Sequence, residues 1–256
     1  AATNATLSVY AADGTSAGPP VLLTVAPFSL AKLPYVVPPG AVTAVVTNNS
    51  GGRLLSYATP VDDAVGGGDT WAQSDWNRLS SLPGSEPVLI PIARASSSGP
   101  TYLRTDVSIT NTGNVTATAK VRYTAGATVV EKNVILAPLA TAVHTDIVAG
   151  FLGVTPPSIG SIIITPQGSA FAVTSRTYSS TQGSLATFGT AVPTVALTSG
   201  LIVGQSRLIA GLEDSKATTV NAATPKTART DFGLIERTGQ AATVKVSLYL
   251  NDGRSL

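Results

Sequence analysis

Apolar and polar side chains alternate with a period of two along most of the chain. The alternation is clearest in the segments 107–110, 120–123 and 244–250. Successive side chains of a β-strand point to opposite faces of its sheet, so this pattern predicts half-buried antiparallel strands. Val, Ile and Thr are abundant, and their branched side chains favour a pleated sheet over a helix.

Turn sequences rich in Gly, Pro, Asn and Asp separate the predicted strands at short intervals. They include Asp13-Gly14, Pro38-Pro39-Gly40, Asn111-Thr112-Gly113, Pro166-Gln167-Gly168 and Asn251-Asp252-Gly253. No long stretch has a sustained helical period. A single helical turn is predicted near 146–152, with Thr145 as its cap. The fold class predicted is all-β, built from antiparallel β-sandwiches of the immunoglobulin-like kind.

The segment 101–126 (TYLRTDVSITNTGNVTATAKVRYTAG) is similar to the segment 227–253 (TARTDFGLIERTGQAATVKVSLYLNDG). The Arg-Thr-Asp at 104–106 and the Lys-Val at 120–121 recur at one common offset. The Thr-Gly between them comes one residue later in the second copy, so two compensating one-residue shifts are needed, which a bulge can absorb. We interpret this as one hairpin used twice, the product of an internal duplication.

The beginning of the chain shares the same sequence pattern. The Ala-Pro of 23–30 matches that of 134–141, and the segment 44–58 resembles 162–177. We therefore predict three tandem domains, which are a partial sandwich at 1–80 that lacks its first strands, a complete sandwich at 86–197, and a partial sandwich at 198–256 that lacks its last strands.

A partial sandwich has an open sheet edge and an uncovered apolar face, so something must complete both terminal domains. Two explanations remain open. The sequence is a slice of a longer array of tandem domains, or the tail of one chain completes the head of the next by strand complementation. Such a head-to-tail contact propagates into a filament unless it closes. Both partial domains contain a strand with the pattern Ala-Thr-x-x-Val, at 5–9 and 242–246, as the middle domain does at 117–121. That duplication counts against a clean exchange.

The middle domain resembles tandem Ig-like sandwich repeats of large secreted bacterial surface proteins. The residues that carry the resemblance are Arg104-Thr105-Asp106, Val107–Asn111, Ala117-Thr118, the segment 147–152 and Ser175-Arg176-Thr177-Tyr178. The resemblance implies an extracellular location and a role as a scaffold or adhesive array. It implies no catalytic residues.

The composition argues against several classes of function. Charged residues make up 12% of the chain and the net charge is +2, and no basic patch offers a surface for nucleic acid. The chain has no Cys, which excludes disulfides and thiolate chemistry. It also has no Met, and an Ala-Ala beginning suits the mature side of a signal-peptide cleavage. No apolar run is long enough to span a membrane.

The acidic residues Asp62, Asp63 and Asp69 surround a glycine-rich segment. Carboxylate oxygens are preferred ligands of Ca²⁺, so these three residues are a candidate calcium site, the one cofactor considered. The competing interpretation is a solvated loop, because the spacing does not fit an EF-hand.

Trp71 and Trp76 lie between the first and second predicted domains. Trp rings stack on sugars in carbohydrate-binding modules, so these two residues are a candidate glycan platform. Packing at the domain junction is the competing interpretation.

The Arg-Asp pairs Arg104/Asp106 and Arg229/Asp231 recur with the repeat, which indicates a structural role in which each pair holds itself together or fixes a neighbouring loop. The single histidine, His144, is interpreted as a loop or surface residue, because the sequence contains no G-x-S-x-G elbow to supply a nucleophile.

These observations predict a non-enzymatic extracellular bacterial protein. Its expected role is as a subunit of a surface fibre or tandem-domain array, with copies of itself as partners. The alternative is a carbohydrate- or matrix-binding adhesion module of a larger secreted protein.

Overall fold

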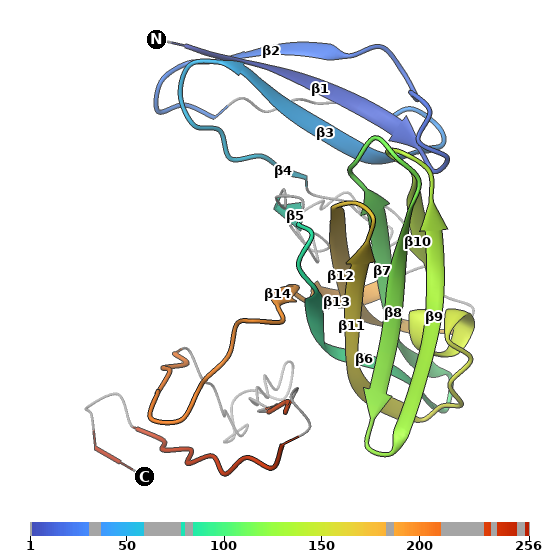
Figure 1. Cartoon of the computed structure of the whole chain (residues 1–256), viewed down its shortest axis with the longest axis vertical. Helices are drawn as coiled ribbons and strands as arrows, with labels where there is room; N and C mark the ends of the chain where they lie inside the picture. Colours follow the sequence, from blue (N-terminus) through green and yellow to red (C-terminus); the bar gives the residue numbers. More distant parts are fainter. Residues whose placement is uncertain are drawn as a thin grey trace, which may run out of the picture. The chain divides into compact units, whose positions relative to one another are not determined.

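The structure is a computed structural model of the 256-residue chain (Figure 1). It describes residues 2–30, 37–58, 78–79, 84–182, 187–210, 233–236, 240–249 and 254–255. The described chain is all-β with antiparallel sheets, as the alternation predicts. It divides into two units, 1–199 and 200–256.

The N-terminal sheet has three antiparallel strands in the order β2-β1-β3 (Figure 1). These strands are β1 (Thr3–Ala11), β2 (Val21–Val25) and β3 (Ala41–Ser50). A short pair, β4 (Tyr57–Ala58) and β5 (Arg78–Leu79), follows in the chain.

Nine further strands form two connected sheets, which we call the central sandwich. They are β6 (Val88–Ser98), β7 (Thr101–Asn111), β8 (Ala117–Ala125), β9 (Thr128–Leu136), β10 (Thr141–His144), β11 (Ser158–Gln167), β12 (Phe171–Thr181), β13 (Thr187–Ala191) and β14 (Val195–Ala196). One sheet runs β6-β11-β8-β9, with β14 beside β6, and the other runs β13-β12-β7-β10.

Strand β6 belongs to both sheets, because residues 88–95 pair with β11 and residues 96–98 pair with β7. The inward-facing side chains of both sheets form one apolar core. Its fully buried members include Ile90, Val107, Ile109, Val121, Tyr123, Ile162 and Ile164. In β8, buried residues alternate with more exposed ones along the strand, which confirms the period-two prediction for 120–123.

The predicted helical turn is present as η1 (Ile147–Phe151), a single π-helical turn. Its cap is not Thr145 as predicted but Asp146, whose side chain accepts a hydrogen bond from the Ala149 amide at 3.3 Å. Asp146 takes a left-handed backbone conformation, φ 52°, which Asp tolerates better than the β-branched Thr. No helix among the described residues is long and apolar enough to cross a membrane.

Residues 244–249, the described part of the strand predicted at 244–250, form no strand. The described residues of the second unit contain a bridge between Tyr249 and Ser255 and no longer ladder. A single strand cannot satisfy its own backbone groups or cover its own apolar face, so the alternating pattern alone does not make it fold.

Candidate functional site

The N-terminal sheet reproduces part of the central sandwich strand by strand. Its order β2-β1-β3 corresponds to β9-β8-β11. Both pairs are antiparallel, but their registers differ by two residues. Ala5 lies opposite Leu23, which the sequence match places on Val134, whereas Ala117 lies opposite Leu136. An even shift leaves the same sides of the strands facing the same way. The segments 3–11 and 117–125 are also those that share the Ala-Thr-x-x-Val pattern.

The two sheets differ at the outer side of the third strand. In the central sandwich, β11 pairs with β8 on one side and with β6 on the other. In the N-terminal sheet, β3 pairs with β1, and no described strand pairs with its other side, which we call the open edge. The backbone N–H and C=O groups of an open edge are a ready template for another strand.

The side chains of β3 are exposed where those of β11 are buried. Ala44 lies opposite Val9, as Ile164 lies opposite Val121, so Ala44 and Ile164 hold the same place. Ile164 is completely buried, whereas Ala44 is exposed. At the alternate positions on either side of Ala44, Val42 is 41% and Val46 is 37% exposed.

The second unit shows the same contrast. The common offset of the repeat places Val244, Val246 and Leu248 on Ala119, Val121 and Tyr123 of β8. All three β8 side chains are fully buried, whereas their counterparts are 48%, 57% and 39% exposed. The chain therefore carries an open edge in one unit and, in the other, an exposed segment that has the alternating pattern of a strand.

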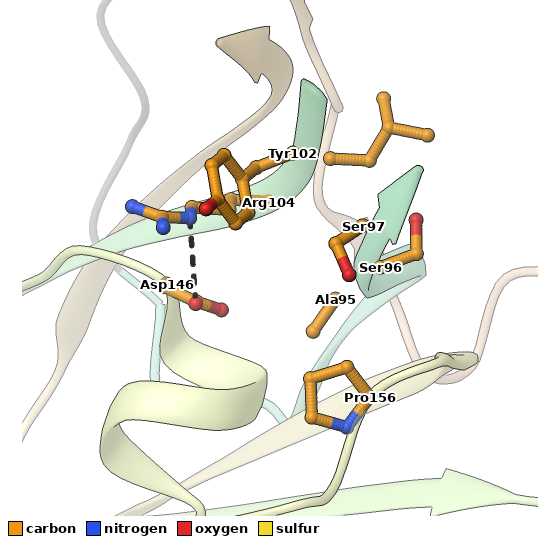
Figure 2. A pocket seen from close by; sticks show the side chains of 8 residues that line it. Ala95, Ser96, Ser97, Tyr102, Arg104, Asp146 and Pro156 are labelled. Atoms are coloured by element: carbon orange, nitrogen blue, oxygen red, sulfur yellow. Dashed lines mark ion pairs between the residues drawn. The ribbon is translucent and has the colours of Figure 1, made fainter. Parts of the chain in front are cut away.

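A charged network surrounds Asp106 of β7. Its carboxylate accepts a hydrogen bond from Nε of Arg176 on β12 at 3.0 Å and another from the Asp146 amide at 3.0 Å. Arg104 lies 3.7 Å from the Asp146 carboxylate (Figure 2). Asp106 thus fixes the loop before η1, which is the neighbouring-loop role considered for Arg104 and Asp106.

The sequence does not identify Asp146 and Arg176 as part of a site. Arg176 carries part of the family resemblance, but it lies far from Asp106 along the chain and no local spacing reveals their contact. The alignment of β7 with β12, in which Arg176 lies opposite Asp106, brings the two charges together.

Replacement of Asp106 by asparagine is expected to destabilise the fold by about 1–3 kcal/mol, because a carboxylate hydrogen-bonded to a guanidinium is replaced by an amide that presents a donor to it. The side chains of Asp106 and Arg176 are 14% and 16% exposed, so water does little to compensate. Urea unfolding measures the loss. The matched control is Glu131→Gln in the exposed Lys120–Glu131 pair, for which we expect little change. Equal losses in both variants would contradict this.

Figure 2 shows a shallow hollow beside this network, lined by Ala95, Ser96, Ser97, Tyr102, Leu103, Arg104, Asp146 and Pro156. The guanidinium of Arg104 lies 4.8 Å from the centre of the Tyr102 ring. The hollow encloses about 170 Å³. Pockets for drug-sized ligands usually enclose about 300–1,000 Å³, so this hollow is small for a substrate.

The sequence predicts His144 to be a loop or surface residue, but it lies in a strand and is half-buried. It lies on β10 opposite Val107, and its ring packs 4.0 Å from the ring of Phe151. Its Nε2 atom is buried, with no hydrogen-bond partner among the described residues. Burial lowers the pKa of His144 below its ordinary value of 6.5, because the charged imidazolium loses its hydration.

Stability is therefore expected to fall as the pH drops from 7 toward 5. The unfolded chain takes up a proton near pH 6.5 while folded His144 resists it, so protonation favours unfolding below that pH. His144→Phe keeps a ring against Phe151 and removes the titration. Thermal unfolding at several pH values should show a smaller loss between pH 7 and 5 in this variant than in the wild type. If the melting temperatures of the two proteins changed equally between pH 7 and 5, His144 would not be the source of the pH dependence.

Several predicted site residues lie outside the described residues. These are the calcium candidates Asp62, Asp63 and Asp69, the tryptophans Trp71 and Trp76, and the second Arg-Asp pair, Arg229 and Asp231. Within the described part of the chain, no group of three or more His, Asp or Glu side chains is arranged to hold a metal ion.

Comparisons with known proteins add little to this geometry. No protein-family model matches the chain, and no curated protein matches it. Among solved structures, the chain is similar to a protein described as Thermotoga maritima 1070, with a TM-score of 0.35 and 15% sequence identity. The similarity covers 42% of this chain and 92% of the other.

Proposed function

We propose that this protein is an extracellular structural protein, a subunit of a bacterial surface fibre or tandem-domain array. Its Ig-like units complete one another head-to-tail by β-strand complementation. The observation that carries the proposal is the open edge of β3, with exposed Ala44 in the place where the central sandwich buries Ile164.

The physical drive for such assembly is the burial of alternating apolar side chains. Val42, Ala44 and Val46 on β3 are exposed, as are Val244 and Val246 in the second unit. Each Å² of apolar surface removed from water contributes roughly 25 cal/mol, and a paired edge also satisfies its backbone groups. Exposed apolar patches of this kind are a recognised mark of interaction surfaces.

The composition is compatible with a structural role. The low charge and the many small and β-branched residues suit closely packed sheets. The single histidine packs against Phe151, and the hollow beside Arg104 is small, so neither favours an enzyme.

The proposal is tested by the mass of the purified chain in solution as a function of its concentration. The informative variant is Val46→Lys, which places a charge on the apolar face of β3. Thr47→Lys is the matched control, because Thr47 is the next residue, is also exposed and points to the opposite face.

The wild type and Thr47→Lys are expected to form larger species as the concentration rises, and Val46→Lys is expected to stay smaller at the same concentrations. A wild type that stays monomeric throughout would overturn the proposal. A monomer that binds glycans would instead favour a carbohydrate-binding module.

A further inference from the structure

The segment 201–207 has the same sequence pattern as the first part of β6. The first reads LIVGQSR and the second, 88–94, reads VLIPIAR. Both have three apolar residues, then a residue that interrupts regular structure, and an Arg at the same distance. The two segments also lie in the same order relative to their Arg-Thr-Asp motifs, at 104–106 and 229–231.

In the central sandwich this part of β6 covers the outer side of β11. Val88 lies opposite Ile164 and Ile90 lies opposite Ile162. Ile90 is completely buried and Leu89 is 6% exposed. The N-terminal sheet contains the counterpart of β11 but, among the described residues, no strand in the place of β6.

In the second unit the matching side chains are not covered. Leu201, Ile202 and Val203 are 49%, 69% and 104% exposed. The backbone there makes a local turn, in which the Gln205 amide donates to the Ile202 carbonyl at 3.0 Å. No described strand pairs with 201–203, so this segment has no sheet partner among the described residues.

We propose that residues 201–203 of a second copy of this chain pair antiparallel with the open edge of β3, in the place that β6 takes beside β11. This inference rests on the proposed function and names the strand that performs it. The contact is head-to-tail, so each added chain presents a new open edge and a new free segment.

The register follows from the pairing of β3 with β1 together with the match of 201–207 to 88–94. Leu201 corresponds to Val88, which lies opposite Ile164. Ala44 holds the place of Ile164, because it lies opposite Val9 as Ile164 lies opposite Val121. Leu201 of one copy therefore lies opposite Ala44 of the next.

Disulfide formation tests this register directly, because the chain has no cysteine of its own. Residues directly opposite each other in an antiparallel pair have the Cα spacing that a disulfide needs. The experiment mixes an Ala44→Cys chain with a Leu201→Cys chain under mild oxidation and follows the covalent heterodimer on a non-reducing gel. The matched control replaces Ala44→Cys by Asn48→Cys. Asn48 is exposed and lies on the same face of β3, but it is too far along the strand from Ala44 to form the same disulfide.

The expected result is a heterodimer with Ala44→Cys that is lost with Asn48→Cys, and a ladder of oligomers from the double variant Ala44→Cys/Leu201→Cys. A double variant that yields only a cross-linked monomer would show that the chain completes itself, which overturns the inference. Equal cross-linking at Ala44 and Asn48 would also overturn it.

The two proposals fail in different ways. If the wild type assembles and the Ala44–Leu201 cross-link is absent, the assembly stands and the choice of strand is wrong. If the wild type stays monomeric at every concentration, both proposals are wrong. Each single-cysteine chain is first compared with the wild type by thermal unfolding under reducing conditions. A variant that unfolds like the wild type but gives no cross-link then shows that the register is wrong.

Discussion

Replacement of Asn111 by aspartate is expected to cost the central sandwich about 3–5 kcal/mol, the range measured when a buried charge is left without a partner. Asn111 ends β7 and is completely buried. Its amide nitrogen donates to the carbonyls of Val115, Leu136 and Ala137 at 2.7, 3.0 and 3.1 Å. One side chain thus fastens the turn after β7 to the end of β9.

An aspartate has nearly the same shape as asparagine but no donor when ionised. It would place a carboxylate against three carbonyl oxygens, and each buried carbonyl would lose its partner. The amide of Gly113, which donates to Oδ1 at 3.0 Å, is the one contact that a carboxylate would keep.

The matched control is Asn114→Asp, because Asn114 lies in the same turn and is exposed. Urea unfolding followed by circular dichroism should give a much lower midpoint for Asn111→Asp and a nearly unchanged midpoint for Asn114→Asp. If both variants unfold at the same urea concentration, Asn111 does not hold the turn as described.

Truncation of Tyr123 to alanine is expected to lower the free energy of unfolding by about 3–5 kcal/mol, as for other fully buried aromatic side chains. Tyr123 is completely buried on β8, and its hydroxyl lies 2.7 Å from that of Ser158. Tyr123→Phe should cost much less, because it removes the hydroxyl contact and leaves the ring in the core.

The repeat offers a control with the opposite expectation. Leu248 holds the place of Tyr123 in the second copy, but 39% of it is exposed. Leu248→Ala is therefore expected to leave the unfolding midpoint of the isolated chain almost unchanged. A large loss from Leu248→Ala in dilute solution would contradict the exposure of this segment.

The strands of the central sandwich could be predicted from the sequence because each one carries its own signal. The alternation of β8 and the turn after β7 depend on neighbouring residues, so a short window suffices. The sequence matches of 23–30 with 134–141 and of 44–58 with 162–177 also predict which strands of the N-terminal sheet correspond to β9 and β11.

The site residues depend on contacts between distant segments, which a short window does not contain. Asp106 meets Arg176 across β7 and β12, and Asn111 at the end of β7 meets Leu136 at the end of β9. The sequence predicts Asn111 only as a turn residue, because its neighbours in the chain do not reveal that its side chain is buried.

The segment 244–250 shows that a clear strand pattern does not by itself produce a strand. Its alternation is as clear as that of β8, yet its described residues form no strand. The pattern specifies which face a strand would bury, and the partner sheet that makes burial favourable has to come from elsewhere.

The central claim is that uncovered sheet edges join copies of this chain. It is tested most directly by negative-stain electron microscopy of the purified chain at increasing concentration, with its mass measured in the same samples. The account predicts filaments whose axial repeat corresponds to one chain. A monodisperse monomer at every concentration would contradict it.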